Sequence, residues 1–318
     1  MMDQMRTVAT LAGISLVLSL SSCGNEGVPE RDGAAASTTD GNAAGAATAS
    51  PDSGPKIVDL SEQVVLAASP YQRSAQDPVV LCFGPQTDIY PPNCGGPELE
   101  GAFSWADYDT QREGDVTWTD DGVFAVGHYD LDAGEYGTFT LTQPLRSDPT
   151  AGYTRHDTTQ TDLDALCQDP TADAGATEHD GGRSGMDEEQ ALLMLLRQDL
   201  PGYSTSWLSE GGVTNVLFTE GTDIDSTRAA IREVYTGPLC LEVRDVPSDA
   251  DLRAAQGAVS QQSDLRFHSV GTAGSEPQLQ VEVVVPDRET VDAIYEAAAP
   301  WLAPEQIVIT GAVQQLEP

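Results

Sequence analysis

Residues 279–313 read LQVEVVVPDRETVDAIYEAAAPWLAPEQIVITGAV, and this stretch predicts a strand, a helix and another strand in that order. In its middle, apolar residues recur three or four positions apart, which is the spacing of one helix face. These residues are Val291, Ile294, Tyr295, Ala298 and Leu302. Residues 213–246 repeat the order of apolar strand, helix and apolar strand. The chain therefore predicts a duplicated β-α-β unit, with the helices of both copies on one face of an antiparallel sheet.

Two further helices belong to the same lobe. One begins at Asp187 and stops before Pro201-Gly202, a pair that ends helices. The other spans residues 249–262, where Ser248 and Asp251 have the spacing of a capping pair. Residues 187–318 are therefore expected to form an α+β domain.

The preceding lobe, residues 57–146, contains six short stretches typical of β-strands. They cover residues 64–67, 79–83, 101–105, 116–119, 123–129 and 136–141. Asp121-Gly122 separates two of them and is the preferred corner of a tight hairpin. Because no helix pattern accompanies these strands, we expect a small β-barrel or sandwich, and an α+β fold for the whole chain.

The N-terminus carries an apolar run, residues 8–20, that is too short to cross a bilayer of ~30 Å. The run ends in Leu20-Ser21-Ser22-Cys23, which resembles the lipobox of bacterial lipoproteins. The resemblance implies that residues 1–22 are a signal peptide and that Cys23 receives a diacylglyceryl group. Two acyl chains give durable anchoring to the outer face of the cytoplasmic membrane. The alternative is a plain secretory signal with an incidental cysteine.

After the lipidated cysteine, residues 23–56 are rich in Gly, Ala, Ser and Thr and predict a disordered tether. Four cysteines then remain, an even number that suits disulfides in an oxidising compartment. Cys82 and Cys94 are near in sequence, so we pair them and assign Cys167 to Cys240, although four cysteines allow three pairings. Zinc is disfavoured because no Cys-x-x-Cys occurs.

The charge is strongly one-sided, with 51 acidic and 15 basic residues and a net charge of -36. Such a chain lacks the cationic surface that nucleic acid requires, so we expect no nucleic-acid partner. Part of the acidity lies in residues 147–186, a Gly-rich connector between the lobes whose charges we interpret as solvated.

Few residues are candidates for catalysis or metal binding. The sequence has four histidines and no recognisable nucleophile or phosphate-binding motif, so we expect neither an enzyme nor a cofactor. His128, Asp130 and Asp132 alternate along a predicted strand and are weak candidates for a metal site. The plainer interpretation, which we favour, is a solvated hairpin tip.

Aromatic residues gather in the first lobe, and Tyr90, Trp105 and Trp118 are possible ligand contacts. Aromatics beside acidic residues suit the sugar rings of an envelope glycan, whereas the alternative is a small core built from large side chains. Tyr90 is the strongest candidate because its Pro-Pro loop lies between two cysteines.

Two resemblances bear on function. The stretch from Leu81-Cys82-Phe83-Gly84 to Tyr90-Pro91-Pro92-Asn93-Cys94-Gly95-Gly96-Pro97 resembles a motif of secreted actinobacterial lipoproteins that have no established activity. Trp207-Leu208 with Val216-Leu217-Phe218-Thr219 is similar to the pro-region of secreted chymotrypsin-like bacterial proteases, which implies protease inhibition.

From the sequence we therefore expect an extracytoplasmic, membrane-anchored module that binds a protein or glycan of the cell envelope without catalysing a reaction. The alternatives are an inhibitor that resembles a protease pro-region and a hydrolase with an unfamiliar site.

Overall fold

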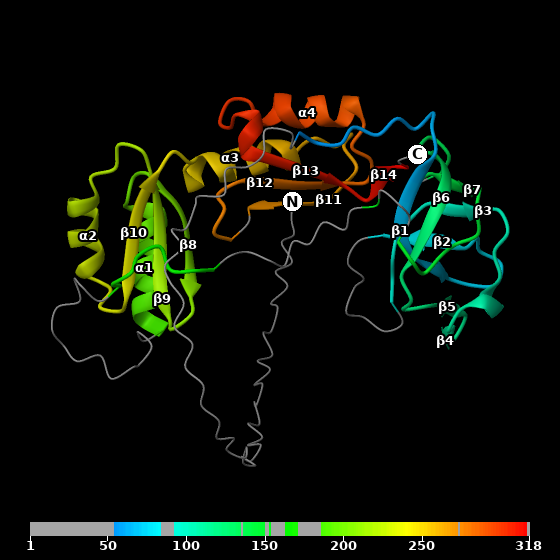
Figure 1. Cartoon of the computed structure of the whole chain (residues 1–318), viewed down its shortest axis with the longest axis horizontal. Helices are drawn as coiled ribbons and strands as arrows, with labels where there is room; N and C mark the ends of the chain where they lie inside the picture. Colours follow the sequence, from blue (N-terminus) through cyan, green and yellow to red (C-terminus); the bar gives the residue numbers. More distant parts are fainter. Residues whose placement is uncertain are drawn as a thin grey trace, which may run out of the picture. The chain divides into compact units, whose positions relative to one another are not determined.

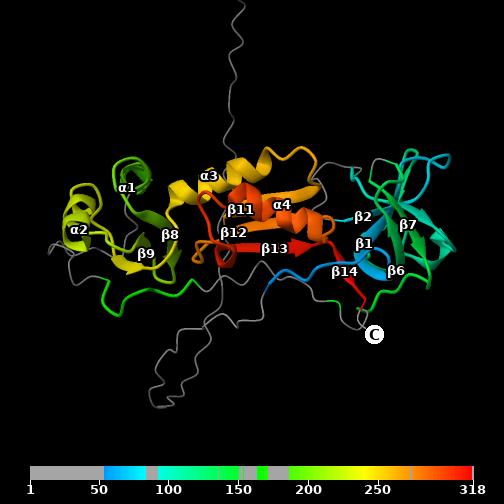
Figure 2. The same cartoon turned by 90° about the horizontal axis from the view of Figure 1, so that it is seen from above.

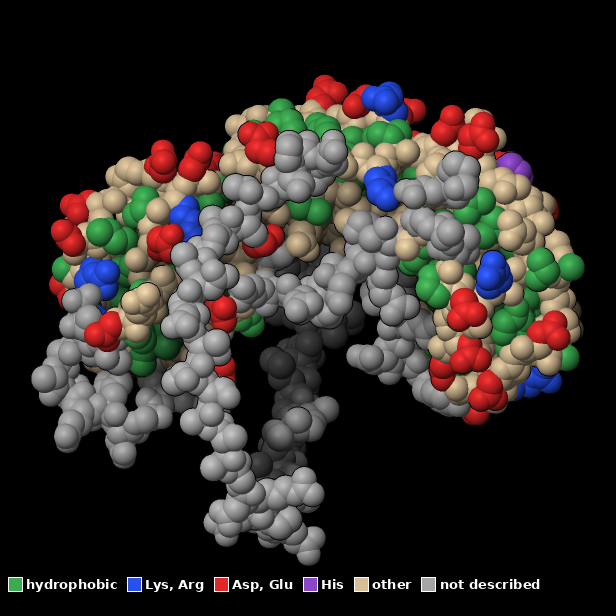
Figure 3. Space-filling view, viewed as in Figure 1, with side chains coloured by type: hydrophobic (Ala, Val, Ile, Leu, Met, Phe, Trp, Pro, Cys, Tyr) green, Lys and Arg blue, Asp and Glu red, His purple; other side chains and the backbone are tan. Residues whose placement is uncertain are grey.

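The computed structural model describes residues 54–83, 92–134, 136–149, 153, 163–170, 186–272 and 274–316. The expected signal peptide, lipidated cysteine and most of the tether lie outside these residues. No helix in the described ranges is long and apolar enough to cross a membrane. Acidic side chains are scattered over the face seen in Figure 3, and basic ones are few.

The first lobe is a barrel, which decides between the two predicted architectures. Its strands are β1 (Val64–Gln72), β2 (Val80–Cys82), β3 (Glu98–Glu100), β6 (Val123–Asp130) and β7 (Thr138–Leu141). They pair in the ring β1-β2-β3-β7-β6, and β6 returns to β1, so the sheet closes on itself (Figure 1). Only the β3–β7 pairing is parallel among the ring pairs in these described strands.

The barrel core draws on both ends of the described chain. Leu66, Leu81, Ala125 and Phe139 are completely buried and pack with Val313. Val313 opens the short strand β14 (Val313–Gln315), which pairs antiparallel with β1 (Figure 1). The sequence predicted one strand at the end of residues 279–313, but the chain leaves one sheet after Gly311 and joins another at Val313.

Two details of the first lobe correct the sequence predictions. The hairpin expected at Asp121-Gly122 is wrong. β5 (Val116–Trp118) and β6 both pair with β1, at successive positions along it, instead of pairing with each other. Gly122 does not adopt the positive φ that a type I′ hairpin corner requires. β5 instead forms a ladder with β4 (Gln111–Glu113), which the sequence analysis missed.

The strand expected over 101–105 is also wrong. Strand β3 ends at Glu100, and Gly101 follows with φ +118°, which turns the chain away. A 3₁₀ helix then spans Trp105–Asp107, and the Ser104 side chain accepts a hydrogen bond from the Ala106 N–H at its start. Short polar caps of this kind favour a helical turn over a ladder.

The C-terminal lobe begins with one α-β-β-α-β unit. Its elements are α1 (Met186–Gln198), β8 (Tyr203–Ser209), β9 (Val213–Thr219), α2 (Ile224–Arg232) and β10 (Leu239–Arg244). Strand β9 lies in the middle, antiparallel to β8 and parallel to β10. Both helices lie on one side of the sheet (Figure 2), where their apolar side chains pack on β9.

A second unit repeats this order. It consists of α3 (Asp249–Ser260), β11 (Phe267–Thr272), β12 (Leu279–Val283), α4 (Arg288–Ala298) and β13 (Ile307–Gly311). Strand β12 is again central, antiparallel to β11 and parallel to β13. As the sequence predicted, Ser248 caps α3 by accepting a hydrogen bond from the Asp251 N–H at 3.1 Å.

Equivalent hydrogen bonds confirm the duplication. The Thr219 N–H donates to the Gly202 carbonyl at 2.8 Å, and the Val284 N–H donates to the Arg266 carbonyl at 2.9 Å. The duplicated units form two separate mixed sheets, however, where an antiparallel sheet was expected. The physical reason is that a helical crossover between neighbouring strands makes those strands parallel.

Candidate functional site

The first candidate site lies beside the Cys82–Cys94 disulfide, which joins the end of β2 to the segment that leads into β3. The Leu81 N–H donates to the Pro97 carbonyl at 3.0 Å, so this segment lies against β2. A Cβ on Gly96 would come within 2.0 Å of the Leu81 carbonyl oxygen. The approach of the two backbones therefore requires glycine at this position.

A cavity of about 200 Å³ opens at this place, formed within the barrel lobe. Its walls come from the end of β1 and the turn after it, from the disulfide segment and from the approach to β7. The lining residues are Tyr71, Arg73, Asp77, Pro78, Val80, Cys94, Gly95, Gly96, Glu98, Tyr136 and Gly137. We call this cavity the barrel pocket.

Tyr136 is the large aromatic side chain of the barrel pocket that reaches solvent, with 42% of its surface exposed. Its backbone is fixed from two sides, because the Tyr129 hydroxyl donates to the Tyr136 carbonyl and Gly137 adopts φ +84°. Burial raises the pKa of Tyr129 to about 12, against a smaller lowering by Arg266, so this hydroxyl stays protonated and remains a donor.

The ring of Tyr136 also lies directly against Gly95. A Cβ on Gly95 would come within 2.6 Å of the ring carbon Cζ. Gly95 therefore leaves room for the Tyr136 ring, and Gly96 leaves room for the β2 backbone. The exposed ring is positioned by its surroundings before any ligand arrives.

Charged side chains complete the barrel pocket. Arg73, Asp77 and Glu98 are all exposed at its wall. One carboxylate oxygen of Asp77 accepts a hydrogen bond from the Ser74 hydroxyl at 2.8 Å, which holds the turn. The side-chain amide of Gln72 donates to the backbone carbonyl of Asp77 at 2.8 Å, which also holds this turn.

Trp105, a predicted ligand contact, supports this wall and does not line the pocket. Its indole N–H donates to the Gln72 side-chain oxygen at 3.0 Å. Its ring meets Phe103 edge-on, with ring centroids 4.9 Å apart, and Phe103 stacks on Tyr108. The three aromatics thus form a small partly buried cluster next to the turn.

Trp118 and Tyr90, the other two predicted contacts, have different outcomes. Trp118 is 2% exposed and packs with Tyr71 and Cys82, so its ring belongs to the core and is not presented to a ligand. Tyr90 lies outside the described residues, as does Cys23.

The weak metal candidate forms a turn. His128 and Asp130 are exposed on β6, and one Asp130 carboxylate oxygen accepts a hydrogen bond from the Asp132 N–H at 3.0 Å. Within the described ranges, no three His, Cys, Asp or Glu side chains are grouped so as to hold a metal ion. The favoured interpretation, a solvated hairpin tip, agrees with this geometry.

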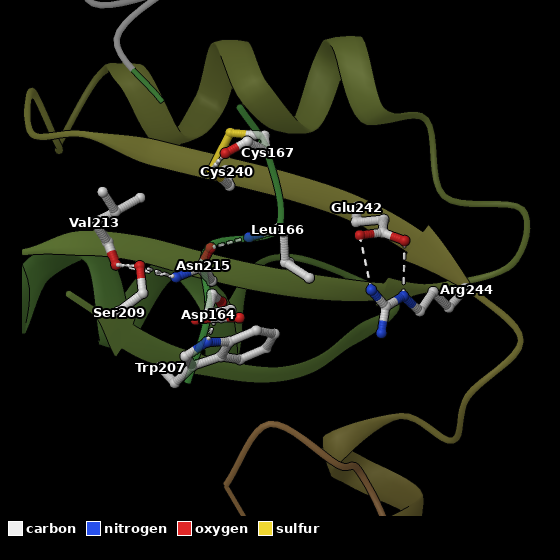
Figure 4. The surroundings of a disulfide bond; sticks show 10 residues. All are labelled: Asp164, Leu166, Cys167, Trp207, Ser209, Val213, Asn215, Cys240, Glu242 and Arg244. Carbon is white, nitrogen blue, oxygen red and sulfur yellow. Dashed lines mark hydrogen bonds and ion pairs between the residues drawn. A yellow bond between two sulfur atoms is a disulfide. The ribbon is translucent and has the colours of Figure 1, made fainter. Parts of the chain in front are cut away.

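A second disulfide, Cys167–Cys240, fastens a short segment across the first C-terminal sheet (Figure 4). We call residues 163–167 the strap. The Leu166 N–H donates to the Asn215 side-chain oxygen at 2.8 Å, and the Trp207 indole donates to the Asp164 carbonyl at 3.1 Å. Asn215 is completely buried and also donates to the Ser209 hydroxyl at 3.0 Å.

The strap covers the sheet face that the helices leave open. Val216 and Phe218 point into the helix side, so Asn215, one position away, points to the other side. The Cα atoms of Cys167 and Cys240 are 5.6 Å apart. Both disulfides expected from the sequence are present. We interpret the strap as structural, because its polar contacts are satisfied within the chain.

Comparison with protein families, with curated proteins and with solved structures gave no match. The two disulfides indicate an extracytoplasmic location.

Sequence reasoning missed Arg73, Asp77, Glu98 and Tyr136 as pocket residues. They come from the turn after β1, from β3 and from the segment before β7, and closure of the barrel, which no local pattern reveals, brings them together. A usable signal was present at Tyr136-Gly137, where an aromatic residue precedes a glycine at the start of a strand. Glycine at such a position indicates a special backbone conformation that fixes its neighbour.

Proposed function

We propose that this protein is a lipid-anchored module on the outer face of the cytoplasmic membrane that binds a component of the cell envelope through its barrel pocket. The anchor rests on the lipobox-like Leu20-Ser21-Ser22-Cys23 sequence. The two disulfides support the compartment, because cytosolic conditions keep thiols reduced.

The observation that carries the binding function is the exposed Tyr136 ring, fixed at the pocket mouth. The Tyr136 ring is 42% exposed, so its surface is open to a ligand. Here a buried hydroxyl, a left-handed glycine and a close glycine contact all act on that one residue. Preorganisation of this kind lowers the entropic cost of binding.

The chemistry of the lining supports a binding function. Among the described residues that line the pocket there is neither a histidine nor a hydroxyl of Ser or Thr, and Cys94 is held in its disulfide. The pocket offers an aromatic ring and three charged groups, which suit recognition.

The test is capture of envelope material by the full chain, purified in detergent from its native membrane. We expect the wild-type chain to retain an envelope component and the Tyr136→Ala variant to lose it. Trp301→Ala is the matched control, because Trp301 is a similarly exposed aromatic, at 40%, outside the barrel pocket. Equal recovery from all three chains would refute a role for the pocket.

A second candidate function comes from the resemblance to protease pro-regions. Its residues lie on the paired strands β8 and β9, where Leu208 is 54% exposed at the sheet edge. An exposed apolar residue on an edge strand suits contact with another protein. Inhibition of secreted serine proteases by micromolar full chain, lost in Leu208→Asp, would support this function, and absence of inhibition would remove it.

A further inference from the structure

We propose that the barrel pocket binds one uncharged saccharide ring, a ligand class that rests on the proposed binding function. The proposal deepens that function by stating what the pocket recognises. Three properties of the described lining suit such a ring: an exposed aromatic side chain, carboxylates at the wall and a small volume.

Tyr136 provides the aromatic contact. A sugar ring presents one face of C–H groups, which is apolar, while its hydroxyls point outward around the edge. Tyr136 offers a flat apolar surface of matching kind. Its ring lies against Gly95, and its backbone is held by the Tyr129 hydroxyl and precedes the left-handed Gly137. Tyrosine also adds a hydroxyl at its tip, so one side chain supplies both an apolar and a polar contact.

The wall supplies the polar contacts. Asp77 and Glu98 are acceptors for hydroxyl hydrogens, and Arg73 is a donor to hydroxyl oxygens. Hydrogen bonds to charged groups are stronger than those between neutral groups. Adjacent hydroxyls on a sugar ring can use this mixture, whereas a purely apolar ligand would leave all three groups desolvated.

The sign of the charge selects among sugars. Two carboxylates and one guanidinium leave the pocket net acidic, and the whole chain carries a charge of -36. Like charges in a pocket are repulsive, so uronic acids and phosphorylated sugars are disfavoured. An uncharged ring avoids this cost and keeps the hydroxyl contacts.

The volume limits the length of the ligand. The cavity of about 200 Å³ is smaller than the ~300–1,000 Å³ of pockets that hold drug-sized molecules. It therefore accommodates a single ring, which can be a free monosaccharide or the end unit of a polymeric glycan. Comparison of a monosaccharide with its oligomer distinguishes these sources, because an end-unit site binds both.

The experiment uses the full chain in detergent and measures its binding to galactose, N-acetylglucosamine and their oligosaccharides by calorimetry. Galacturonic acid oligomers are the charged match for galactose. We expect a neutral saccharide to bind, and the uronic acid to bind about tenfold more weakly or not at all, equivalent to ~1.4 kcal/mol or more.

Variants place the binding at the pocket. Tyr136→Ala should weaken binding by about tenfold, which corresponds to ~1.4 kcal/mol. Tyr136→Phe keeps the ring and should retain most of the affinity, Glu98→Gln should lose part of it, and Trp301→Ala should leave it unchanged. Tyr136→Phe and Glu98→Gln keep the test valid even where the alanine variant does not fold.

The outcomes separate this inference from the function on which it rests. If envelope capture depends on Tyr136 but every neutral saccharide fails to bind at millimolar concentration, the ligand class is wrong and the binding function stands. If saccharides bind equally to wild type and Tyr136→Ala, the pocket assignment is wrong. If capture is independent of Tyr136 and no neutral saccharide binds, both are overturned.

Discussion

Removal of the Cys167–Cys240 disulfide should cost more stability than removal of Cys82–Cys94. The first bond joins residues 73 apart in sequence and the second joins residues 12 apart. The longer loop restricts the unfolded chain more, and loop-closure entropy gives ~4.4 kcal/mol against ~2.8 kcal/mol. Loss of the first disulfide also frees the strap, so its two hydrogen bonds to Asn215 and Trp207 weaken as well.

The assay is urea unfolding of the two double variants, Cys167→Ala/Cys240→Ala and Cys82→Ala/Cys94→Ala, beside the wild type. Tryptophan fluorescence is a suitable signal, because Trp207 lies under the strap and Trp118 lies beside Cys82. We expect the free energy of unfolding to fall in both variants, by about 1.6 kcal/mol more in the first. An equal or larger loss in the second variant would refute the reasoning.

The other predictions concern single residues. Gly96→Ala should lower the free energy of unfolding by about 1–3 kcal/mol, because the added Cβ would collide with the Leu81 carbonyl. The control Gly122→Ala should change it by less than about 1 kcal/mol, because the space around Gly122 is open, and thermal unfolding compares the two variants. Burial lowers the pKa of His268, so the folded state binds fewer protons than the unfolded state, and stability should fall as pH drops below the ordinary value of 6.5. Urea midpoints at pH 7.5 and 5.5 should show a smaller difference in His268→Gln; an equal difference would contradict this. Asn215→Ala should cost ~1–3 kcal/mol and speed hydrogen exchange of the strap amide, and unchanged exchange would show that the contact is unimportant.

Local patterns predicted the elements whose cause is local. The helix α4 buries Val291, Ile294 and Ala298, as their spacing required, and the Ser248 cap starts α3 at the expected residue. The duplication was visible for the same reason, since each copy repeats its own apolar periods. The disulfide pairing chosen from the short distance between Cys82 and Cys94 is the one observed, although the sequence allowed three pairings.

The features that the sequence did not predict depend on pairing between strands that are distant in sequence. Nothing local shows that the chain leaves the sheet of β13 and pairs with β1 through β14, or that β5 and β6 share one side of β1. Trp118 was placed among ligand contacts because its type suits that role, but burial in the core depends on strands distant in sequence. Tyr136 was missed because its support comes from Gly95, 41 positions earlier, and from the hydroxyl of Tyr129.

The most direct test of the central claim, an anchored module that works outside the cytoplasm, is the intact mass of the mature protein from its native membrane. We predict a chain that starts at Cys23, carries a diacylglyceryl group there and contains two disulfides. Cys23→Ala should remove the lipid and release the protein from the membrane fraction. A mature chain with an unmodified thiol at Cys23, or one that still contains residues 1–22, would contradict the account.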